Sequence, residues 1–469
     1  MPRSATRGRT WPGVSEVDGR AAPFAVLCAV AGERLPFFLD GGMDPRRLGR
    51  HSFVGCNPVL TVRSRGKCVE VDGQRADGNP FSVLRHLLKA HRTPGAAAPI
   101  PFTGGAVGYF AYDLAHFIEH LPGTARDDIP MPEMHFAFYD AVAGFDHGTR
   151  KWYVSSIDLG APGAARRRSE LIAAVKGAPA PPAFRPVSSG PPRSNFTHDE
   201  YLRAIRRTKD YIAAGDIFQA NISQRFEAET DATPLELYAA LRSANPAPFA
   251  CCLPLDEGAV ISSSPERFLK VTGRRVETRP IKGTRPRRPG NEAFNERMRR
   301  ELLASAKDRA ELTMIVDLER NDLGRVCSYG SVRVTEPIVL EEYPTVYHLV
   351  ATVEGELHEG HDIVDLVKAT FPGGSITGAP KIRAMEIIDE LEPTRRSVYT
   401  GNIGYLGCDG AADLNIAIRT MILARGKAYL QVGGGIVADS EPEAEYQETL
   451  DKAHAMLQAL GAVPAGPGR

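Results

Sequence analysis

A lysine and a glutamate near a predicted β-hairpin have the residue types and the spacing that covalent chemistry requires. Alternating runs flank Thr272-Gly273, which predicts two strands joined by a two-residue turn. Counting outward from that turn, Val271 faces Arg274 and Glu266 falls opposite Arg279. Lys282 lies three residues beyond Arg279. The hairpin is therefore expected to bring an acid and an amine together at one end of a sheet.

A lysine attacks as a nucleophile only when it is neutral. Its ordinary pKa of about 10.4 leaves roughly one molecule in a few thousand neutral at pH 7. Burial and neighbouring cations both lower that pKa. Four arginines follow or precede Lys282 closely in the sequence: Arg279, Arg285, Arg287 and Arg288. A nucleophilic lysine is one interpretation, and a solvated lysine on a basic strand edge that discourages aggregation is the other.

Two glycine-rich segments could approach an anion closely. Residues 371–381 read FPGGSITGAPK, where Pro380 suits the first turn of a helix and the small residues leave backbone N–H groups open. The segment is not a Walker A loop, because Ala379-Pro380 separate Gly378 from Lys381. A tight strand-to-helix joint explains the spacing equally well. Gly433-Gly434-Gly435 predicts a second close approach of the backbone, or a bulge or turn.

Acidic residues on two predicted helices could hold a divalent cation. On a helix over residues 441–460, Glu441, Glu445, Glu448 and Lys452 fall in one stripe, with apolar residues opposite. Such a stripe usually faces water, but Mg²⁺ also binds carboxylates together with substrate oxygens. Glu311 shares a helix face with apolar residues, where an unpaired acid is unusual. An ion pair with Lys307 is the alternative explanation.

The predicted elements indicate an α+β fold. Short strands are expected before residue 158: Leu35–Leu39, Ser52–Val54, Val59–Val62 and Lys151–Ser156, with a helix over Phe81–His91. Residues 159–196 contain a basic run and a Pro-rich tail and are expected to form a linker. A capping box, Thr197 to Glu200, then starts a helix that Gly215 ends. Strands and helices mix without strict alternation from there on.

Composition excludes several classes of function. The chain has 57 Lys+Arg and 57 Asp+Glu, so it lacks the basic surplus typical of a nucleic-acid binder. The early apolar stretch of residues 21–32 is too short to span a membrane, and the first residues do not resemble a secretory signal. Seven scattered cysteines without CxxC spacing favour reduced thiols, and hence a cytoplasmic location.

Several strings taken together resemble the chorismate-utilising enzymes, which include the large components of anthranilate synthase and aminodeoxychorismate synthase. The strings are DIFQANISQRF from Asp216, SPE from Ser264, PIKGTR from Pro280, KDRAELTMIVDLERNDL from Lys307, PGGSITGAPK from Pro372, YTGNIGY from Tyr399, DLNIAIRT from Asp413 and GGGIVADSEPEAEYQETLDKA from Gly433. They cover residues 197–458, and weaker matches near Ser52 and Gly104 extend the resemblance to residues 1–158. The family fold is α+β, with two packed β-sheets and outer helices, so residues 1–158 and 197–463 are expected to form one interleaved domain.

The resemblance implies a catalytic and metal-binding set. Lys282 in PIKGT is the expected nucleophile of the aminodeoxychorismate synthase branch, where anthranilate synthases typically carry Ala, and Glu266 is the expected general acid. Mg²⁺ would be held by Glu311 and Glu448, with Glu445 close by. Ala220 stands where salicylate and isochorismate synthases typically place a water-activating lysine. Substrate-binding positions would be Thr284, His348, Ser375, Thr377, Gly378, Tyr399, Arg419, Gly433, Gly434, Gly435 and Lys452.

The implied reaction is amination of chorismate to 4-amino-4-deoxychorismate, a step towards 4-aminobenzoate and folate. Anthranilate synthesis is the alternative, and a non-catalytic binding protein and a pyridoxal-phosphate enzyme are two further ones. A glutaminase needs a Gly-x-Cys-x-Gly elbow, which the surroundings of Cys408 do not supply, so a separate glutaminase component is expected to provide ammonia. The stretch from Phe38 to Gly42 departs from the tryptophan site of feedback-inhibited relatives, so tryptophan inhibition is not expected. The oligomeric state stays open.

Overall fold

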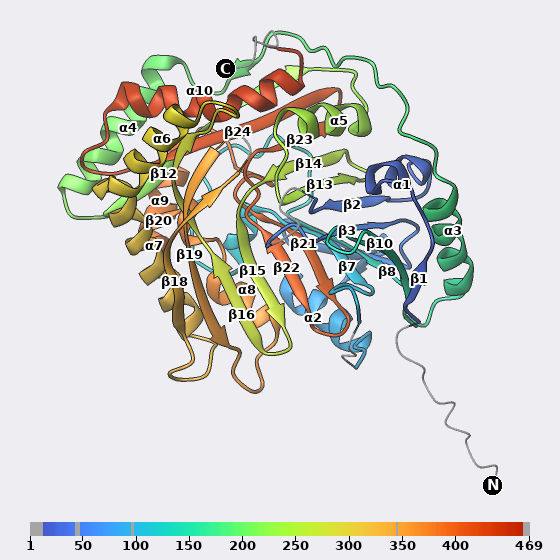
Figure 1. Cartoon of the computed structure of the whole chain (residues 1–469). Helices are drawn as coiled ribbons and strands as arrows, with labels where there is room; N and C mark the ends of the chain where they lie inside the picture. Colours follow the sequence, from blue (N-terminus) through green and yellow to red (C-terminus); the bar gives the residue numbers. More distant parts are fainter. Residues whose placement is uncertain (1–12, 43–46, 95–97, 344–345, 463–469) are drawn as a thin grey trace.

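Two large antiparallel sheets form the centre of the molecule (Figure 1). The computed structural model describes residues 13–42, 47–94, 98–343 and 346–462. The expectation of no secretory signal rests on the first twelve residues, which lie outside these ranges. One sheet has the order β1 (Ser15–Val17), β10 (Lys151–Ser156), β9 (Ala141–Asp146), β3 (His51–Gly55), β2 (Phe37–Asp40), β13 (Phe249–Pro254), β14 (Ala259–Ser264), β23 (Thr420–Ala424), β24 (Lys427–Ile436), β12 (Gln219–Glu229) and β11 (Arg193–Ser194), with β20 (Gly378–Ala379) beside β12.

The second sheet also has twelve strands. Its order is β17 (Ile281–Pro286), β19 (Val346–Glu356), β16 (Arg275–Arg279), β15 (Arg267–Thr272), β22 (Ala412–Asn415), β21 (Asn402–Gly407), β7 (Gly105–Phe110), β8 (Met134–Tyr139), β4 (Leu60–Arg65), β5 (Cys68–Val71) and β6 (Gln74–Ala76), with β18 (Arg333–Glu342) beside β19. Residues 1–158 and 197–463 contribute to both sheets, joined where β2 pairs with β13 and where β7 pairs with β21. Neither stretch completes a sheet by itself.

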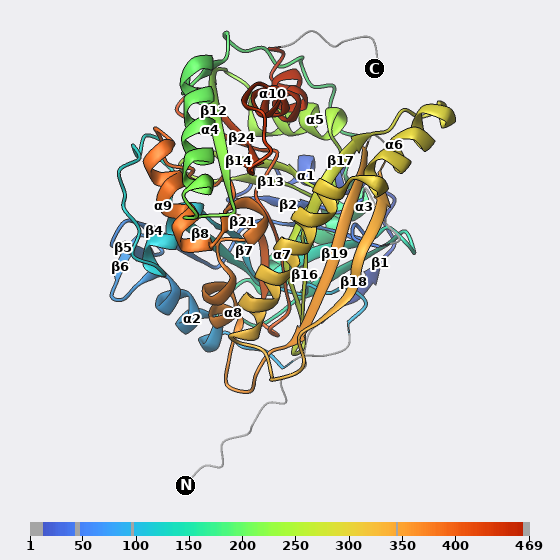
Figure 2. The ribbon, with the colours of Figure 1, turned by 90° about the vertical axis from the view of Figure 1, so that its left-hand side faces the viewer.

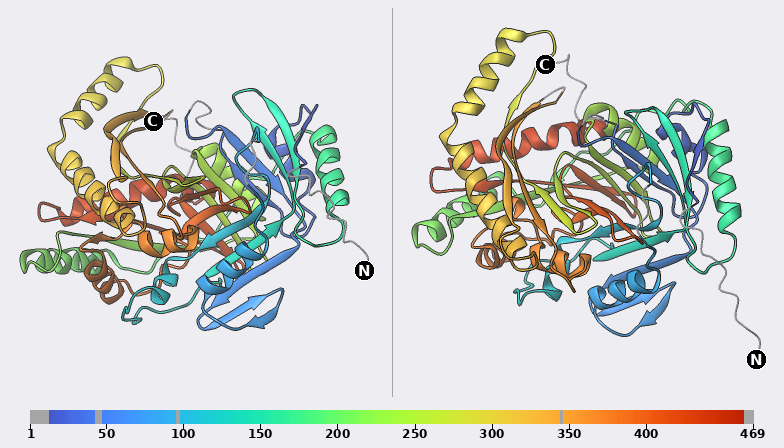
Figure 3. Two further views of the ribbon diagram at one scale, coloured as in Figure 1. Left: turned by 90° about the horizontal axis from the view of Figure 1, so that it is seen from below. Right: turned by 60° about the horizontal axis from the view of Figure 1, so that its bottom comes forward.

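Helices cover the outer faces of the two sheets (Figures 1 and 2). They are α1 (Pro23–Ala29), α2 (Pro80–Ala90), α3 (Ala164–Gly177), α4 (His198–Ala213), α5 (Pro234–Ala244), α6 (Glu292–Ala304), α7 (Ala306–Gly324), α8 (Ile363–Thr370), α9 (Lys381–Leu391) and α10 (Pro442–Ala459), with 3₁₀ turns η1 (Tyr112–Phe117) and η2 (Gly374–Ile376). Figure 3 shows α6 projecting beyond the sheets, whereas α10 lies along the body of the molecule. The expected α+β fold with two sheets and outer helices is confirmed.

An aromatic layer fills the space between the sheets. Phe53 of the first sheet contacts Tyr405 of the second, with ring centroids 5.8 Å apart, and Phe37 contacts Tyr139 at 4.5 Å. These residues belong to one buried apolar cluster that both sheets share. Separate clusters lie beneath the helices on each outer face. The sandwich is therefore rigid where its two sheets meet, which gives the loops at its ends a fixed support.

Local sequence signals predicted several elements well. Thr197 caps α4 with the reciprocal bonds of a capping box, as expected. The predicted strand Lys151–Ser156 is β10, and the C-terminal helix differs from its expected bounds by one residue at each end. The expected linker contains α3, and residues 178–192 then cross the molecule towards β11, touching strand structure through one isolated bridge, Ser189 to Thr230. No helix of the described ranges is long and apolar enough to span a membrane.

The predicted register of the hairpin is wrong. The turn lies one residue later, so Thr272 pairs with Arg275, and a bulge between Arg267 and Lys270 shifts the strands again. Arg267, rather than Glu266, therefore lies opposite Arg279. The reason is local: Gly273 occupies the first turn position with φ of +62°, a conformation that costs glycine little.

Candidate active site

A cavity of about 610 Å³ opens between the ends of β12, β17 and β24 and the helices α7 and α10. It collects most of the predicted site residues: Glu266, Lys282, Thr284, Glu311, His348, Ser375, Tyr399, Arg419, Gly433, Gly434, Gly435, Glu445, Glu448 and Lys452. Thr377 and Gly378 are not among its lining residues. The Thr377 hydroxyl donates to Gly373 O at 2.9 Å, and Gly378 pairs with β12. This part of the loop is thus a strand-to-helix joint, and only its start reaches the cavity.

Lys282 lies on β17, where the sheet register shifts next to Gly283. Its amine faces the cavity, and no carboxylate of the described residues comes within 4.0 Å of it. Burial lowers the pKa of Lys282 from its ordinary value; the Lys452 ammonium lowers it further, while Glu311 and Glu266 oppose the shift. A buried amine without a close counter-ion is the form of lysine that is readily available as a nucleophile.

The four arginines expected around Lys282 do not gather there. Of these four, only Arg285 lines the cavity, and it also binds Asp308 at 3.1 Å. Arg279 is paired with Glu341 at 2.7 Å, Arg287 contacts Glu342 at 2.8 Å, and Arg288 stacks over the ring of Phe294. Their strands and loops turn the side chains towards acids and rings outside the cavity. The pKa of Lys282 is therefore lowered by burial and by Lys452 rather than by these arginines.

Glu266 is the buried acid of the cavity, with only 4% of its surface exposed. It follows β14, and its Oε1 accepts a hydrogen bond from the backbone N–H of Ile281 at 3.3 Å. Ser375 lines the same cavity. Burial raises the pKa of Glu266 to about 7, although Ser375, Lys282 and Arg419 favour the ionised form. A carboxyl that holds its proton near neutral pH can act as a general acid.

Part of the cavity wall carries cationic and polar groups that are suited to carboxylates. No carboxylate of the described residues forms an ion pair with Arg419, and burial lowers its pKa, although an arginine stays charged. Lys452 donates to Gly433 O at 2.8 Å. Thr284 Oγ1 and His348 Nδ1 lie 2.9 Å apart, and burial lowers the pKa of His348 to about 3, so this imidazole is neutral. The wall thus offers positive charge without competing protein anions at Arg419.

The glycines of β24 are needed for space. A Cβ on Gly435 would lie 2.3 Å from Gln219 Nε2 and 3.4 Å from Lys282 Nζ. A Cβ on Gly434 would lie 3.1 Å from Glu445 Oε2. Side chains here would displace the amine and the carboxylates that face them. The interpretation of close backbone approach, rather than a turn, fits this part of the strand.

Three glutamates line the α7 and α10 side of the cavity, two of them beside Lys307 and the third paired with Lys452. Lys307 Nζ lies 3.9 Å from Glu311 Oε1 and 3.7 Å from Glu445 Oε1, so the alternative ion pair of Glu311 is present but long. Burial raises the pKa of Glu311, while Lys282 and Lys307 lower it. Burial also acts on Glu448, but Lys452 at 2.7 Å outweighs it and holds that pKa below its ordinary value.

The donor chemistry of these glutamates suits Mg²⁺, because the ion prefers carboxylate oxygens together with water and substrate oxygens. As the side chains stand, no group of three or more His, Cys, Asp or Glu in the described ranges is arranged around a common metal position. Lys307 lies between two of the acids instead. The residues therefore fit the ion in kind, and a substrate carboxylate would have to complete the ligand set.

Two lining residues with unpartnered oxygens are among those not predicted from the sequence. Asn221 Oδ1 and Gln431 Oε1 are buried at the cavity without hydrogen-bond partners among the described residues. Both lie on paired strands, Asn221 on β12 and Gln431 on β24. Strand alternation from Gln219 would have pointed to Asn221, since residues two apart share a face. Each amide can orient a bound polar molecule.

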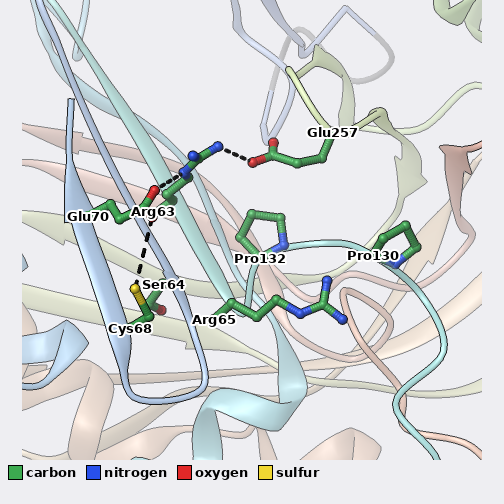
Figure 4. Close-up of a pocket in the computed structure, with 8 residues that line it drawn as sticks. All are labelled: Arg63, Ser64, Arg65, Cys68, Glu70, Pro130, Pro132 and Glu257. Carbon is green, nitrogen blue, oxygen red and sulfur yellow. Dashed lines mark hydrogen bonds and ion pairs between the residues drawn. The ribbon is translucent and has the colours of Figure 1, made fainter. Parts of the chain in front are cut away.

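Another hollow, on the outer strands, is lined by charged side chains that pair with one another (Figure 4). Its Arg63 guanidinium lies between Glu70, at 2.7 Å, and Glu257, at 2.5 Å. Arg65 pairs with Asp127 at 3.3 Å. The opposite charges of this hollow satisfy one another, so nothing in it calls for a charged ligand.

An unpaired amine, a protonated acid and a free arginine around one cavity define an enzyme that acts on a small carboxylate-bearing molecule. Residues 43–458 match the family described as chorismate binding enzyme. The chain belongs to this family and is a chorismate-utilising enzyme, as the resemblance predicted.

Relatives divide between two reactions. The chain is 43% identical to anthranilate synthase component 1 of Thermus thermophilus, over 92% of this chain and 93% of that one. It is 40% identical to aminodeoxychorismate synthase component 1 of Bacillus subtilis, over 89% and 91%. A crystal structure of anthranilate synthase component I from Streptococcus pneumoniae superposes with a TM-score of 0.79 at 34% identity, covering 87% of this chain and 92% of that one. Overall identity therefore does not choose between the two products.

Proposed function

We propose that this chain aminates chorismate to 4-amino-4-deoxychorismate. The observation that carries the proposal is the amine of Lys282, which faces the cavity without a close counter-ion and shares the cavity with the protonated carboxyl of Glu266. A reaction that forms anthranilate needs no covalent amine at this position. A lysine nucleophile would divide one difficult displacement into two easier ones.

The chain's own groups can carry each step. Neutral Lys282 adds to ring carbon C2, both ring double bonds shift, and the C4 hydroxyl leaves with the proton of Glu266 as water. Ammonia then adds at C4, both double bonds shift back, and the bond between C2 and the Lys282 nitrogen breaks. The new C4 ammonium returns one proton to the Glu266 carboxylate. One water is released, one ammonia is incorporated, and the amine is regenerated. Arg419 and Lys452 would bind substrate carboxylates throughout.

Mg²⁺ is the proposed cofactor, held by Glu311 and Glu448, with Glu445 close to both. When bound, it would neutralise a ring carboxylate of chorismate beside these acids. Ammonia is proposed to come from a separate glutaminase component, because the sequence lacks the cysteine elbow of a glutaminase.

Anthranilate synthesis remains the second candidate, because the relative from Thermus thermophilus, at 43% identity, carries that name. A product assay separates the two. Purified protein is given chorismate, Mg²⁺ and an ammonium salt, and the products are separated by chromatography. The proposal predicts 4-amino-4-deoxychorismate without release of pyruvate. Anthranilate and pyruvate in equal amounts, without the 4-amino product, would refute it.

A further inference from the structure

Glu319 of α7 is a buried acid that lies outside the cavity. It is 2% exposed, and its Oε1 accepts a hydrogen bond from Gly374 N at 3.2 Å. Its Oε2 accepts one from the Thr278 hydroxyl at 3.3 Å. No lysine or arginine nitrogen of the described residues forms an ion pair with it. The nearby cation, Lys381, binds Asp322 and Thr370 O instead.

The two segments that Glu319 holds lead to residues that act on Glu266. Gly374 directly precedes Ser375, which lines the cavity together with Glu266 and favours the ionised form of that acid. Thr278 lies in β16, three residues before Ile281, whose N–H donates to Glu266 at 3.3 Å. The carboxyl group of Glu319 therefore contacts both segments from outside the cavity.

The segment around Ser375 has little freedom to move independently of α7. A Cβ on Gly374 would lie 2.5 Å from Leu318 Cδ2 and 3.4 Å from Glu319 Oε1. Across the turn, the Thr377 hydroxyl donates to Gly373 O at 2.9 Å. A change at Glu319 must therefore reach Ser375, because the turn is packed directly against the helix.

We propose that Glu319 is a positioning residue for Glu266, since from outside the cavity it holds the turn that carries Ser375 and the strand that leads to Ile281, the donor to Glu266. The inference rests on the proposed role of Glu266 as general acid. A proton donor has to be within hydrogen-bond reach of the leaving oxygen, and a misplacement of about 1 Å can cost on the order of 100-fold in rate.

A second effect of Glu319 is electrostatic. Burial, together with the carboxylates of Asp322 and Glu266, raises its pKa to about 7, although Lys381 opposes the shift. The groups that face Glu266 are Ser375, Lys282 and Arg419. Ionisation of either carboxyl makes ionisation of the other harder, so the pair keeps its last proton to a higher pH than a lone acid would.

Two substitutions separate these effects. Glu319→Gln keeps an acceptor for Gly374 N but removes the charge, and Glu319→Leu removes both. The matched control is Asp113→Asn, because Asp113 is 7% exposed, accepts a backbone N–H from Ser397 at 2.8 Å, also has its pKa raised to about 7 by burial, and does not line the cavity. The readouts are kcat and KM for chorismate consumption across pH, together with the thermal midpoint of each variant.

Glu319→Leu should lower kcat by about 100-fold while KM stays within about threefold, since substrate contacts are intact. Glu319→Gln should keep kcat within about threefold at low pH, but its alkaline limb should move about one pH unit lower. The inference is overturned if Glu319→Gln leaves the alkaline limb unmoved. A kcat loss in both Glu319 variants no larger than that of Asp113→Asn also overturns it. If Glu319→Leu does not fold, the Gln variant decides.

Infrared titration of the resting protein separates this inference from the proposed function. The carboxyl C=O band of Glu266, identified by its loss in Glu266→Gln, should lose its proton at lower pH when Glu319 is Gln. This readout needs no turnover. An unchanged midpoint refutes the coupling, whereas a shifted midpoint in a protein that does not consume chorismate would refute the proposed function alone.

Discussion

Two of the cavities lined by cations and acids differ in how those charges are paired. In the cavity of Lys282, the buried acid Glu266 and the half-buried cation Arg419 form no salt bridge with each other or with any other described residue. The second cavity, of about 440 Å³, lies between the sheets. There Arg267 binds Glu277 at 2.7 Å and Asp413 at 3.0 Å.

The acid of the second cavity is equally satisfied. Asp40 accepts hydrogen bonds from Tyr238 at 2.9 Å, from Arg242 at 2.6 Å and from Ser52 at 3.2 Å. Protein groups therefore take the place of water around Asp40, which stabilises its charge and leaves it unreactive. In the Lys282 cavity, by contrast, Lys282, Glu266 and Arg419 form no ion pair with any described residue, although other charged residues of that cavity are paired. This difference, rather than the number of charges, distinguishes a reacting site from a structural one.

Replacing one lysine of each cavity by alanine, in separate variants, should give the largest difference in reaction rate. Lys282→Ala should lower the rate of amination by at least about 10³-fold, because the covalent route is lost. Lys270→Ala is the matched control, since Lys270 lines the second cavity. Its rate should stay within about twofold of the wild type, in line with ordinary surface changes. Initial rates with chorismate and ammonium salt measure both, and equal losses would abolish the comparison.

Removing the proton of the buried acid should have the next largest effect. Glu266→Gln should slow the reaction by about 10²- to 10⁴-fold, the usual contribution of a general acid. In the wild type, activity should fall as pH rises above about 7, because Glu266 ionises there. At low pH it should fall again as Lys282 becomes protonated. A pH profile of kcat shows both limbs, and an unaltered alkaline limb in Glu266→Gln would exclude the assigned role.

Metal dependence tests whether the acids near Lys307 form a ligand set. Glu311→Gln and Glu448→Gln should each raise the Mg²⁺ concentration needed for half-maximal rate by at least about tenfold. Glu443→Gln, a change on the same helix α10 but paired with exposed His198, is the control and should leave it unchanged. Magnesium titrations after chelator treatment measure this. Full activity of all three variants without added metal would contradict the proposed cofactor.

Stability should respond to pH through Glu266. Its pKa is about 7 in the folded protein, above the ordinary value of 4.5, so the folded state holds the proton more tightly. The free energy of unfolding therefore falls as pH rises from about 4.5 to 7, by about 3 kcal/mol from this group. Denaturant unfolding should show Glu266→Gln gaining stability relative to the wild type between pH 5 and 8. A constant difference would mean that the carboxyl is not shifted.

The smallest effect is expected at the second cavity. L-Tryptophan should leave the rate of chorismate consumption unchanged, because Asp40 is already occupied by Tyr238, Arg242 and Ser52 and cannot bind another ammonium. Initial rates over a range of tryptophan concentrations test this. Saturable inhibition would show that these bonds open for a ligand and that the two cavities are more alike than their pairing indicates.

The sequence predicted best what depends on neighbours along the chain. The capping box of Thr197, the C-terminal helix and the strand Lys151–Ser156 follow from local periodicity, hydroxyl and glycine positions. The two-sheet fold came from the resemblance rather than from periodicity. Pairings across the fold were harder, because they depend on elements distant in sequence.

The hairpin illustrates that limit. Its bulge between Arg267 and Lys270 coincides with an irregularity on the other edge of β15, where β22 pairs, and nothing in the hairpin sequence reveals β22. The arginines near Lys282 likewise form ion pairs with residues distant in sequence, such as Glu341 and Glu342 of β18. Glu319 was overlooked for the same reason: its importance depends on the turn at Gly374, 55 residues away.

The most direct test of the central claim is to trap the covalent step. The protein is mixed with chorismate and Mg²⁺ in the absence of ammonia, quenched with acid, and examined by intact-mass and peptide mass spectrometry. The account predicts an added mass equal to chorismate less one water, located on Lys282 and absent from Lys282→Ala but present in Lys270→Ala. A wild-type protein that makes the 4-amino product yet never carries this mass on Lys282 would contradict it.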